Sequence, residues 1–255
     1  MSGNAGKGTD VGAMAIALIG YGEVGGIFGQ ALAARGVASV TAWDIVLPDP
    51  AKSAAMRGRA QRDGVRLAPD AASAVAGADL VISAVTASAT RDAAASAAPA
   101  MRAGAFLLDV NSASPKTKAA CGTLVNAAGG RYVESAVMTS VPPYGIRVPM
   151  LLGGPDANAV APVLATLGFA ASVASAELGV ASAIKMCRSV MIKGMEAIVI
   201  ESFLAARRYG VEGEVLASLA ETFPGIDWER QGSYFWTRVV QHGKRRAEEM
   251  RESAA

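Results

Sequence analysis

The sequence has few of the residues that commonly carry metal, redox or disulfide chemistry. Its 255 residues include two cysteines and one histidine. The cysteines, Cys121 and Cys187, lie far apart and lack the short spacing of a zinc site, so we expect a reduced protein without a metal. The ten residues before Val11 lack the apolar core of a signal peptide, which indicates a cytoplasmic protein.

An excess of one charge is also missing. The 24 Lys and Arg against 22 Asp and Glu leave a net charge of +2, too small to attract the whole protein to nucleic acid or to an anionic membrane. The basic run at residues 244–246 is followed by two glutamates and is interpreted as a solvated helix face. Apolar runs are short, as at residues 80–85, or broken by charge, as at Lys193 and Glu196, so no membrane span is predicted.

What the sequence does contain is enough apolar material for a substantial core, with 52% hydrophobic residues. Over residues 13–175, strand-like and helix-like segments alternate, which predicts an α/β domain with a mostly parallel sheet. The predicted strands are residues 15–20, 39–44, 65–68, 79–85, 105–109, 132–138, 148–152 and 171–174. The predicted helices are residues 23–35, 50–63, 70–76 and 114–128.

After residue 175 the pattern becomes purely helical. A long helix is predicted from Gly179 to Tyr209, with Gly210 as its stop signal, and further helices follow without a strand signal. We therefore expect an all-helical domain at residues 176–255, for substrate binding and dimerisation, and a flexible start at residues 1–12. The long helix has more apolar positions than so small a domain can cover, which predicts a homodimer.

The first strand leads directly into a G-x-G-x-x-G motif at residues 20–25, and the first helix begins inside the motif. In this context the glycines permit a tight turn, close approach of a pyrophosphate and close helix packing, while the helix amides face the anion. The second strand ends at Asp44, where a carboxylate would accept hydrogen bonds from the adenosine ribose. The alternative is a glycine-rich turn without a ligand. The predicted cofactor-binding residues here are Gly20, Gly22, Glu23, Val24, Gly25 and Asp44.

The carboxylate of Asp44 also bears on the choice of cofactor. It would repel a 2′-phosphate, which favours NAD over NADP. The basic residues Lys52, Arg57 and Arg59 are close enough in sequence to offset that repulsion, so NADP stays an alternative. The predicted strand at residues 79–85 ends at Val85 and is followed by Thr86, and we expect both residues near the nicotinamide ribose. Thr86 could equally be an ordinary helix cap.

The order of three motifs resembles the β-hydroxyacid dehydrogenases, a family that includes 6-phosphogluconate and 3-hydroxyisobutyrate dehydrogenases. The motifs are the glycine loop, the segment D-V-N-S-A-S-P at residues 109–115, and Gly179 followed six residues later by Lys185. The resemblance covers nearly the whole chain. It implies that Asn111 and Ser112 lie in a loop that contacts nicotinamide and substrate, and that Lys185 is the catalytic acid/base.

Lys185 is also unusual among its own neighbours. It is a cation in a mainly apolar segment, where partial burial would lower its pKa toward neutrality and suit it to proton transfer. The alternative is a surface lysine whose stem lies along an amphipathic helix. Two departures from the family pattern put its familiar substrates in doubt. Ser189 replaces the usual asparagine, and Ser135 is followed by Ala and Val instead of two glycines.

Two further side chains are candidates for substrate binding. Arg188, one turn from Lys185, could bind a carboxylate or form a surface ion pair. His242 could reach the site from the helical domain or from a neighbouring subunit, or could be merely structural. The leading prediction is an NAD(P)-dependent oxidoreductase that acts on a small 3-hydroxy or 3-oxo acid or a related carbonyl compound. The alternatives are a non-catalytic dinucleotide sensor and an imine reductase.

Overall fold

The computed structural model describes residues 10–253, with the side chains at positions 242, 244–246, 248, 249, 252 and 253 outside that description. The chain divides into two compact units, Met1–Lys185 and Met186–Ala255. The domain limits expected near residues 12 and 175 stay a prediction. Of the expected flexible start, residues 1–9 lie outside the description. Asp10 then caps a short 3-10 turn, Val11–Ala13, by accepting a hydrogen bond from the amide of Gly12.

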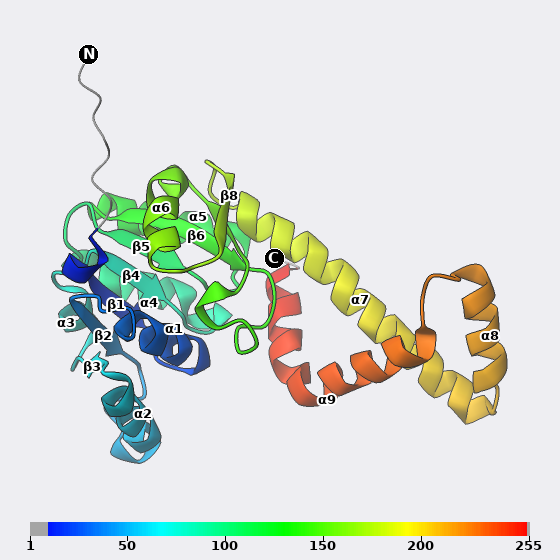
Figure 1. Cartoon of the computed structure of the whole chain (residues 1–255). Coiled ribbons are helices and arrows are strands. Elements are labelled where there is room, and N and C mark those ends of the chain that lie inside the picture. Colours follow the sequence, from blue (N-terminus) through cyan, green and yellow to red (C-terminus); the bar gives the residue numbers. More distant parts are fainter. Residues whose placement is uncertain (1–9, 254–255) are drawn as a thin grey trace. The chain divides into compact units, whose positions relative to one another are not determined.

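The first unit contains one eight-stranded sheet in the order β3-β2-β1-β4-β5-β6-β7-β8 (Figure 1). Every neighbouring pair is parallel except β6 and β7, which confirms the prediction of a mostly parallel sheet. The strands are β1 (Ala15–Ile19), β2 (Ser39–Trp43), β3 (Arg66–Leu67), β4 (Leu80–Ser83), β5 (Phe106–Asp109), β6 (Arg131–Val137), β7 (Met150–Gly153) and β8 (Ala171–Ser175).

Several helices of this unit begin at a residue whose side chain accepts a hydrogen bond from a free backbone amide. Asp49 caps α2, with Pro50 as its first residue, and the Ser114 hydroxyl accepts the Thr117 amide at 3.2 Å at the start of α5. Two helices, α4 and α6, were not predicted from the sequence. The helices are α1 (Glu23–Ala33), α2 (Pro50–Asp63), α3 (Ala71–Val75), α4 (Thr90–Ala97), α5 (Pro115–Ala127) and α6 (Ala157–Thr166).

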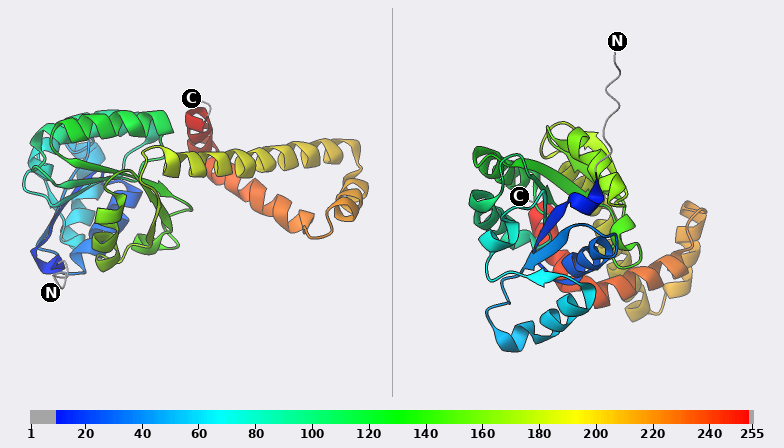
Figure 2. Two further views of the ribbon diagram at one scale, coloured as in Figure 1. Left: turned by 90° about the horizontal axis from the view of Figure 1, so that it is seen from above. Right: turned by 60° about the vertical axis from the view of Figure 1, so that its left-hand side comes forward.

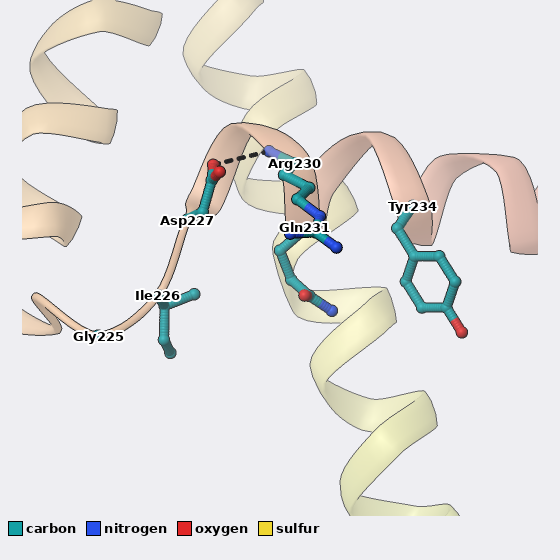
Figure 3. Close-up of a pocket in the computed structure, with 6 residues that line it drawn as sticks. All are labelled: Gly225, Ile226, Asp227, Arg230, Gln231 and Tyr234. Atoms are coloured by element: carbon teal, nitrogen blue, oxygen red, sulfur yellow. Dashed lines mark hydrogen bonds between the residues drawn. The ribbon is translucent and has the colours of Figure 1, made fainter.

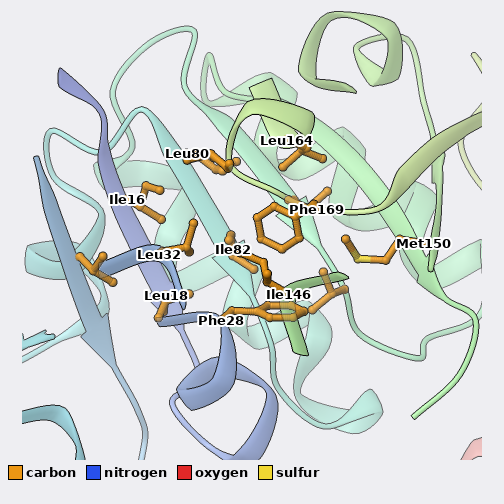
Figure 4. Packing of buried hydrophobic residues seen from close by; sticks show 14 of the residues in the cluster. Ile16, Leu18, Phe28, Leu32, Leu80, Ile82, Ile146, Met150, Leu164 and Phe169 are labelled. Atoms are coloured by element: carbon orange, nitrogen blue, oxygen red, sulfur yellow. The ribbon is translucent and has the colours of Figure 1, made fainter. Parts of the chain in front are cut away.

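Buried side chains lie on both faces of the sheet, where helices cover it. Alternate residues of each strand point to opposite faces, so one strand contributes to both cores. In β1, Ile16 and Leu18 join a core with residues of α1 and α6, shown in Figure 4, where Phe28 and Phe169 pack edge to face at 5.2 Å. Ala17 and Ile19 join the second core, which includes residues of α3, α4 and α5. This three-layer arrangement leaves the ends of the strands as the place for a ligand.

The second unit consists of helices, as Figure 2 shows. The helix α7 (Val180–Tyr209) begins in the first unit and is followed by α8 (Glu212–Thr222) and α9 (Trp228–Ser253). Within this unit, an ion pair of 3.4 Å between Arg238 Nε and Glu196 Oε1 joins α9 to α7. No helix in the described part of the chain is long and apolar enough to cross a membrane.

Candidate functional site

The carboxyl ends of four parallel strands bring the predicted cofactor residues to one edge of the sheet. Gly20 follows β1 and donates its amide to the carbonyl of Trp43, the last residue of β2, at 2.8 Å. Val85, after β4, donates its amide to Asn111 Oδ1, after β5, at 2.6 Å. The sequence motifs from distant parts of the chain therefore lie together because the strands share a direction.

The glycine loop has the shape that a pyrophosphate needs. Gly20 has a φ of +91°, and a Cβ there would collide with the carbonyl oxygen of Ala84. A Cβ on Gly25 would collide with the carbonyl oxygen of Gly20, so α1 packs directly on the loop. Gly22, by contrast, is exposed, and a Cβ on it would meet nothing within 4 Å. It stands at the N-terminus of α1 without a side-chain cap, so the free amides have room for an anion, and these residues fit a dinucleotide.

The Asp44 carboxylate lies beside the glycine loop and is held by two backbone amides. Its Oδ2 accepts the amide of Tyr21 at 2.8 Å, and its Oδ1 accepts the amide of Val46 at 3.1 Å. Each carboxylate oxygen has a further lone pair, so both can still accept a hydrogen bond from a ribose hydroxyl. The carboxylate is thus fixed in position before any ligand arrives.

The three basic residues that could offset the charge of Asp44 differ in their contacts. Lys52 is exposed and pairs with Asp49 at 3.1 Å. Arg57 donates to the carbonyl of Leu47 at 2.8 Å. Arg59 instead contacts the glycine loop, where it donates to the carbonyls of Tyr21 and Gly22, the latter at 3.1 Å. Arg59 is therefore the one of these three cations in direct contact with the loop.

The residues after β4 and β5 form a second part of the site. Asn111 is buried, and its amide nitrogen donates to the Ser83 hydroxyl at 3.0 Å while its oxygen accepts from Val85. Its side chain thus ties the two strand ends together. Thr86 is exposed, with its hydroxyl 3.3 Å from that of Ser88, and its side chain makes no cap hydrogen bond. The expected contacts of Val85, Thr86 and Asn111 with the cofactor stay a prediction.

Lys185 and Ser112 lie together although 73 positions separate them in the sequence. The Lys185 ammonium donates to the Ser112 hydroxyl oxygen over 2.6 Å, and both side chains are partly buried. A hydroxyl that accepts from an ammonium keeps its own hydrogen for a ligand oxygen. The pair therefore places an ammonium and a hydroxyl side by side.

The segment that carries Ser112 begins at a buried hydrogen-bonded network around Asp109, which was not predicted from the sequence. The fully buried Lys118 ammonium contacts Asp109 Oδ1 at 2.8 Å and donates to the Asp109 carbonyl at 2.9 Å. The Tyr132 hydroxyl donates to Asp109 Oδ2 at 2.6 Å, and burial, with Asp109 beside it, raises the pKa of Tyr132 well above its usual value. Because Asp109 Oδ1 also accepts the Asn111 amide at 2.9 Å, the network fixes the start of the segment that carries Ser112.

Glu134 is another residue that the sequence analysis missed. It is fully buried on β6, and its Oε1 accepts the amides of Gly179 at 2.7 Å and Ala181 at 3.1 Å. Its Oε2 accepts the Ser182 hydroxyl at 2.5 Å. The carboxylate therefore caps the first turn of α7, the helix that carries Lys185. The one signal for Glu134 in the sequence is that it directly precedes Ser135, a residue predicted to bind substrate.

The other four predicted substrate residues belong to elements other than the segment that carries Ser112. Ser135 is completely buried in β6, and its hydroxyl has no hydrogen-bond partner among the described atoms. Arg188, which is exposed, and Ser189, which is half-buried, belong to the second unit. His242 lies in α9, but its side chain is outside the described part. Their roles stay predictions.

An open hollow of about 480 Å³ lies in the second unit at the start of α9. Its wall includes Ile226, Asp227, Arg230 and Tyr234, with Asp227 accepting the Arg230 amide at 3.0 Å (Figure 3). None of the predicted site residues lines it. Among the described residues, no group of three or more His, Cys, Asp or Glu side chains is placed to hold a metal ion.

The fold and the glycine loop together define an NAD(P)-binding dehydrogenase fold. The NAD binding domain of 6-phosphogluconate dehydrogenase matches residues 15–174, and a domain of unknown function, DUF1932, matches residues 206–255. The chain belongs to the family of that NAD binding domain, within the β-hydroxyacid dehydrogenase superfamily.

Two similar proteins match most of this chain. An uncharacterized 28.5 kDa protein of Methanothermus fervidus is 30% identical over 196 residues, 76% of this chain and 73% of the relative. A conserved hypothetical protein of Sinorhizobium meliloti is 42% identical, with a TM-score of 0.81 over 97% of this chain and 82% of that chain.

Two more distant structures link the fold to hydroxyacid dehydrogenases. A conserved protein of unknown function, described as structurally similar to 3-hydroxyacid dehydrogenases, is 32% identical, with a TM-score of 0.75 over 94% of this chain and 88% of that one. The 3-hydroxyisobutyrate dehydrogenase of Mycobacterium tuberculosis is 22% identical, with a TM-score of 0.68 over 85% of this chain and 72% of that one. At that identity the likeness shows the fold alone.

Proposed function

We propose that this protein is an NAD(P)-dependent oxidoreductase that transfers a hydride between nicotinamide and a small 3-hydroxy or 3-oxo acid, or a related carbonyl compound. The observation that carries the proposal is the 2.6 Å contact of Lys185 with Ser112. Ser112 follows β5, and β5 pairs with β4, the strand that leads into Val85. In this proposal NAD is preferred to NADP, and the protein acts as a homodimer.

The cofactor side of the proposal rests on the glycine loop and Asp44. The exposed amides at Gly22 and Glu23 would bind the pyrophosphate, and the carboxylate of Asp44 would accept hydrogen bonds from the ribose. Because a 2′-phosphate would bring a second negative charge close to Asp44, we expect weaker binding of NADPH. When bound, the nicotinamide ring would supply or accept the hydride.

The substrate side rests on Lys185 and Ser112. Reduction of a carbonyl leaves negative charge on its oxygen, which the Lys185 ammonium would stabilise and then protonate. The Ser112 hydroxyl would donate to the same oxygen and hold it against Lys185. In the oxidising direction the neutral Lys185 amine would accept the hydroxyl proton. This chemistry suits a C–O bond better than a C=N bond, and it requires no metal.

The cofactor proposal is tested by titrating the protein with NADH and with NADPH and following fluorescence. We expect saturable binding of both, with the lower Kd for NADH because of Asp44. Equal or tighter binding of NADPH would contradict the preference, and binding of neither would remove the proposed function. A protein that binds NADH but turns over none of a panel of 3-hydroxy acids, 3-oxo acids and cyclic imines would be a sensor instead.

The catalytic proposal is tested with Lys185→Ala and Lys185→Met. Loss of the proton-transfer group should lower kcat by about two to four orders of magnitude. The Kd for NADH should stay nearly unchanged, because the glycine loop and Asp44 hold the dinucleotide. Lys116→Met removes an exposed lysine and serves as the control. If either Lys185 variant keeps more than about a tenth of the wild-type kcat, proton transfer belongs to another residue.

A further inference from the structure

The side chain of Arg59 crosses from α2 to the glycine loop. One of its terminal nitrogens, Nη2, donates to two consecutive carbonyls, those of Tyr21 and Gly22. The guanidinium also stands over the Tyr21 ring, with 4.8 Å between its carbon and the ring centre. Two acceptors use both hydrogens of Nη2, so this end of the side chain is committed to the loop.

These contacts bear on which way two peptide groups face, and the Gly22 carbonyl is held further by the Gly26 amide of α1, which it accepts at 3.0 Å. In a trans peptide the carbonyl oxygen and the amide hydrogen point in opposite directions across one plane. Because the Tyr21 and Gly22 carbonyls point at Arg59, the amides of Gly22 and Glu23 point away from it. Gly22 and Glu23 are exposed, and these two amides begin α1, where an anion binds.

Tyr21 itself is held from several sides. Its amide donates to Asp44 Oδ2 at 2.8 Å, and its hydroxyl donates to Asp63 Oδ2 at 3.2 Å. Its side chain is fully buried, and a Cβ on Gly26 would collide with the Arg59 guanidinium. The loop therefore lies between Asp44 on one side and Arg59 on the other, with little freedom for the Tyr21–Gly22 peptide to rotate.

We propose that Arg59 is a positioning residue of the dinucleotide site: it holds the Gly22 amide toward the pyrophosphate and, together with the first turn of α1, the Glu23 amide as well. This inference rests on the proposed cofactor binding and adds a residue to it. The pyrophosphate is common to NADH and NADPH, so Arg59 contributes to the binding of both. A residue that read the 2′-phosphate would contribute to NADPH alone.

The test compares Arg59→Met and Arg59→Lys with the wild-type protein by titration with NADH and with NADPH. We expect Arg59→Met to raise both Kd values about tenfold, by similar factors. Arg59→Lys should recover part of the loss, because an ammonium lacks the planar fork that spans two carbonyls. At saturating NADH, kcat should stay within about twofold, since Arg59 acts on cofactor binding and not on proton transfer.

Arg62→Met is the matched control, because it removes an exposed arginine from the last turn of the same helix. Hydrogen exchange of the ligand-free protein gives a second readout: a peptide that covers residues 20–26 should exchange faster in Arg59→Met and unchanged in Arg62→Met. This readout supports or overturns the loop role even if the wild type binds neither dinucleotide, which would refute the proposed function separately. A loss confined to NADPH, unchanged Kd values, or unchanged exchange would overturn the inference.

Discussion

Cys121 lies on α5 with its side chain fully buried, and its Sγ donates to the carbonyl oxygen of Thr90 over 3.9 Å. Burial, together with the neighbouring Asp109 carboxylate, raises the pKa of Cys121 to about 11, against a smaller lowering by Lys118. A raised pKa means less thiolate at a given pH, and the thiolate is the nucleophile. Cys187 is exposed.

Alkylation should therefore distinguish the two thiols. At pH 8 about one Cys121 in a thousand is a thiolate, and the side chain is also shielded, so we expect iodoacetamide to modify Cys187 and leave Cys121 unmodified in the folded protein. Mass spectrometry of the labelled protein measures this. The variant Cys187→Ser should take up no label until denaturant is added. Rapid labelling of folded Cys187→Ser would show that Cys121 is not enclosed as described.

The position of the glycine loop in the fold could be predicted from the sequence, whereas the side chains that support the loop and α7 could not. The glycine loop follows β1 as predicted, and Ser112 contacts Lys185, because those residue types stand in a pattern with one structural meaning. Arg59 and Glu134 act through contacts with residues 38 and 45 positions away. A lone arginine or glutamate carries no local pattern, so only the fold shows which backbone groups it reaches.

The helix α7 depends on its first turn for its position. Its opening amides would be unsatisfied in the interior without the buried Glu134 carboxylate, and a negative charge also suits the positive end of a helix. A Cβ on Gly153 would collide with that carboxylate, so β7 leaves space for it. Since Lys185 follows Ser182 by three residues, we expect Glu134 to position Lys185 through the helix.

Glu134→Gln tests this role, because an amide keeps the size but turns a donor toward donors. We expect the free energy of unfolding to fall by about 1.5–3 kcal/mol, the usual contribution of a hydrogen bond to a charged group. We also expect kcat to fall at least about tenfold, while the Kd for NADH stays within about twofold. Denaturant unfolding and steady-state kinetics give these values.

Glu177→Gln is the control for that prediction. Glu177 also lies just before α7, but it is exposed, so the variant should leave stability and kcat nearly unchanged. A Glu134→Gln protein that loses stability yet keeps the wild-type kcat would show that Glu134 supports the fold and does not position Lys185.

At the level of whole elements, the strands were predicted more completely than the helices. The central strands β1, β4 and β5 are short, mostly apolar runs between turn residues, which is a strong signal for a buried parallel sheet. The helices α4 and α6 gave weak signals: half of α4 is alanine, and α6 contains Pro162. The antiparallel direction of β7 depends on where the chain crosses after β6, which the hydrophobic pattern does not encode.

At the scale of the whole molecule, the two units differ in how completely they bury their apolar side chains. The first unit covers its sheet on both faces, with two clusters of buried residues. The second unit leaves several large apolar side chains on α7 and α9 exposed. They include Met191 at 65%, Ile198 at 71%, Leu204 at 48%, Trp236 at 48% and Val240 at 71%. A group of this kind is typical of a surface that another chain covers.

We expect a second copy of this chain to cover these residues, giving a homodimer that buries about 1,200–2,000 Å² or more. Sedimentation at micromolar concentration should therefore show a dimer. Ile198→Glu places a charge among apolar side chains that the dimer would bury, so it should shift the protein toward monomer without unfolding it. Circular dichroism would confirm that the helices remain.

The control for the dimer prediction is Tyr144→Glu, which changes a 53% exposed aromatic residue in the first unit. Because Tyr144 lies outside the apolar surface of α7 and α9, this variant should sediment as the wild type does. A wild-type protein that stays monomeric at micromolar concentration would contradict the prediction outright. A double variant, Ile198→Glu with Val240→Glu, that still forms the dimer would place the interface elsewhere. Two buried charges per subunit would cost more free energy than the association of such an interface provides.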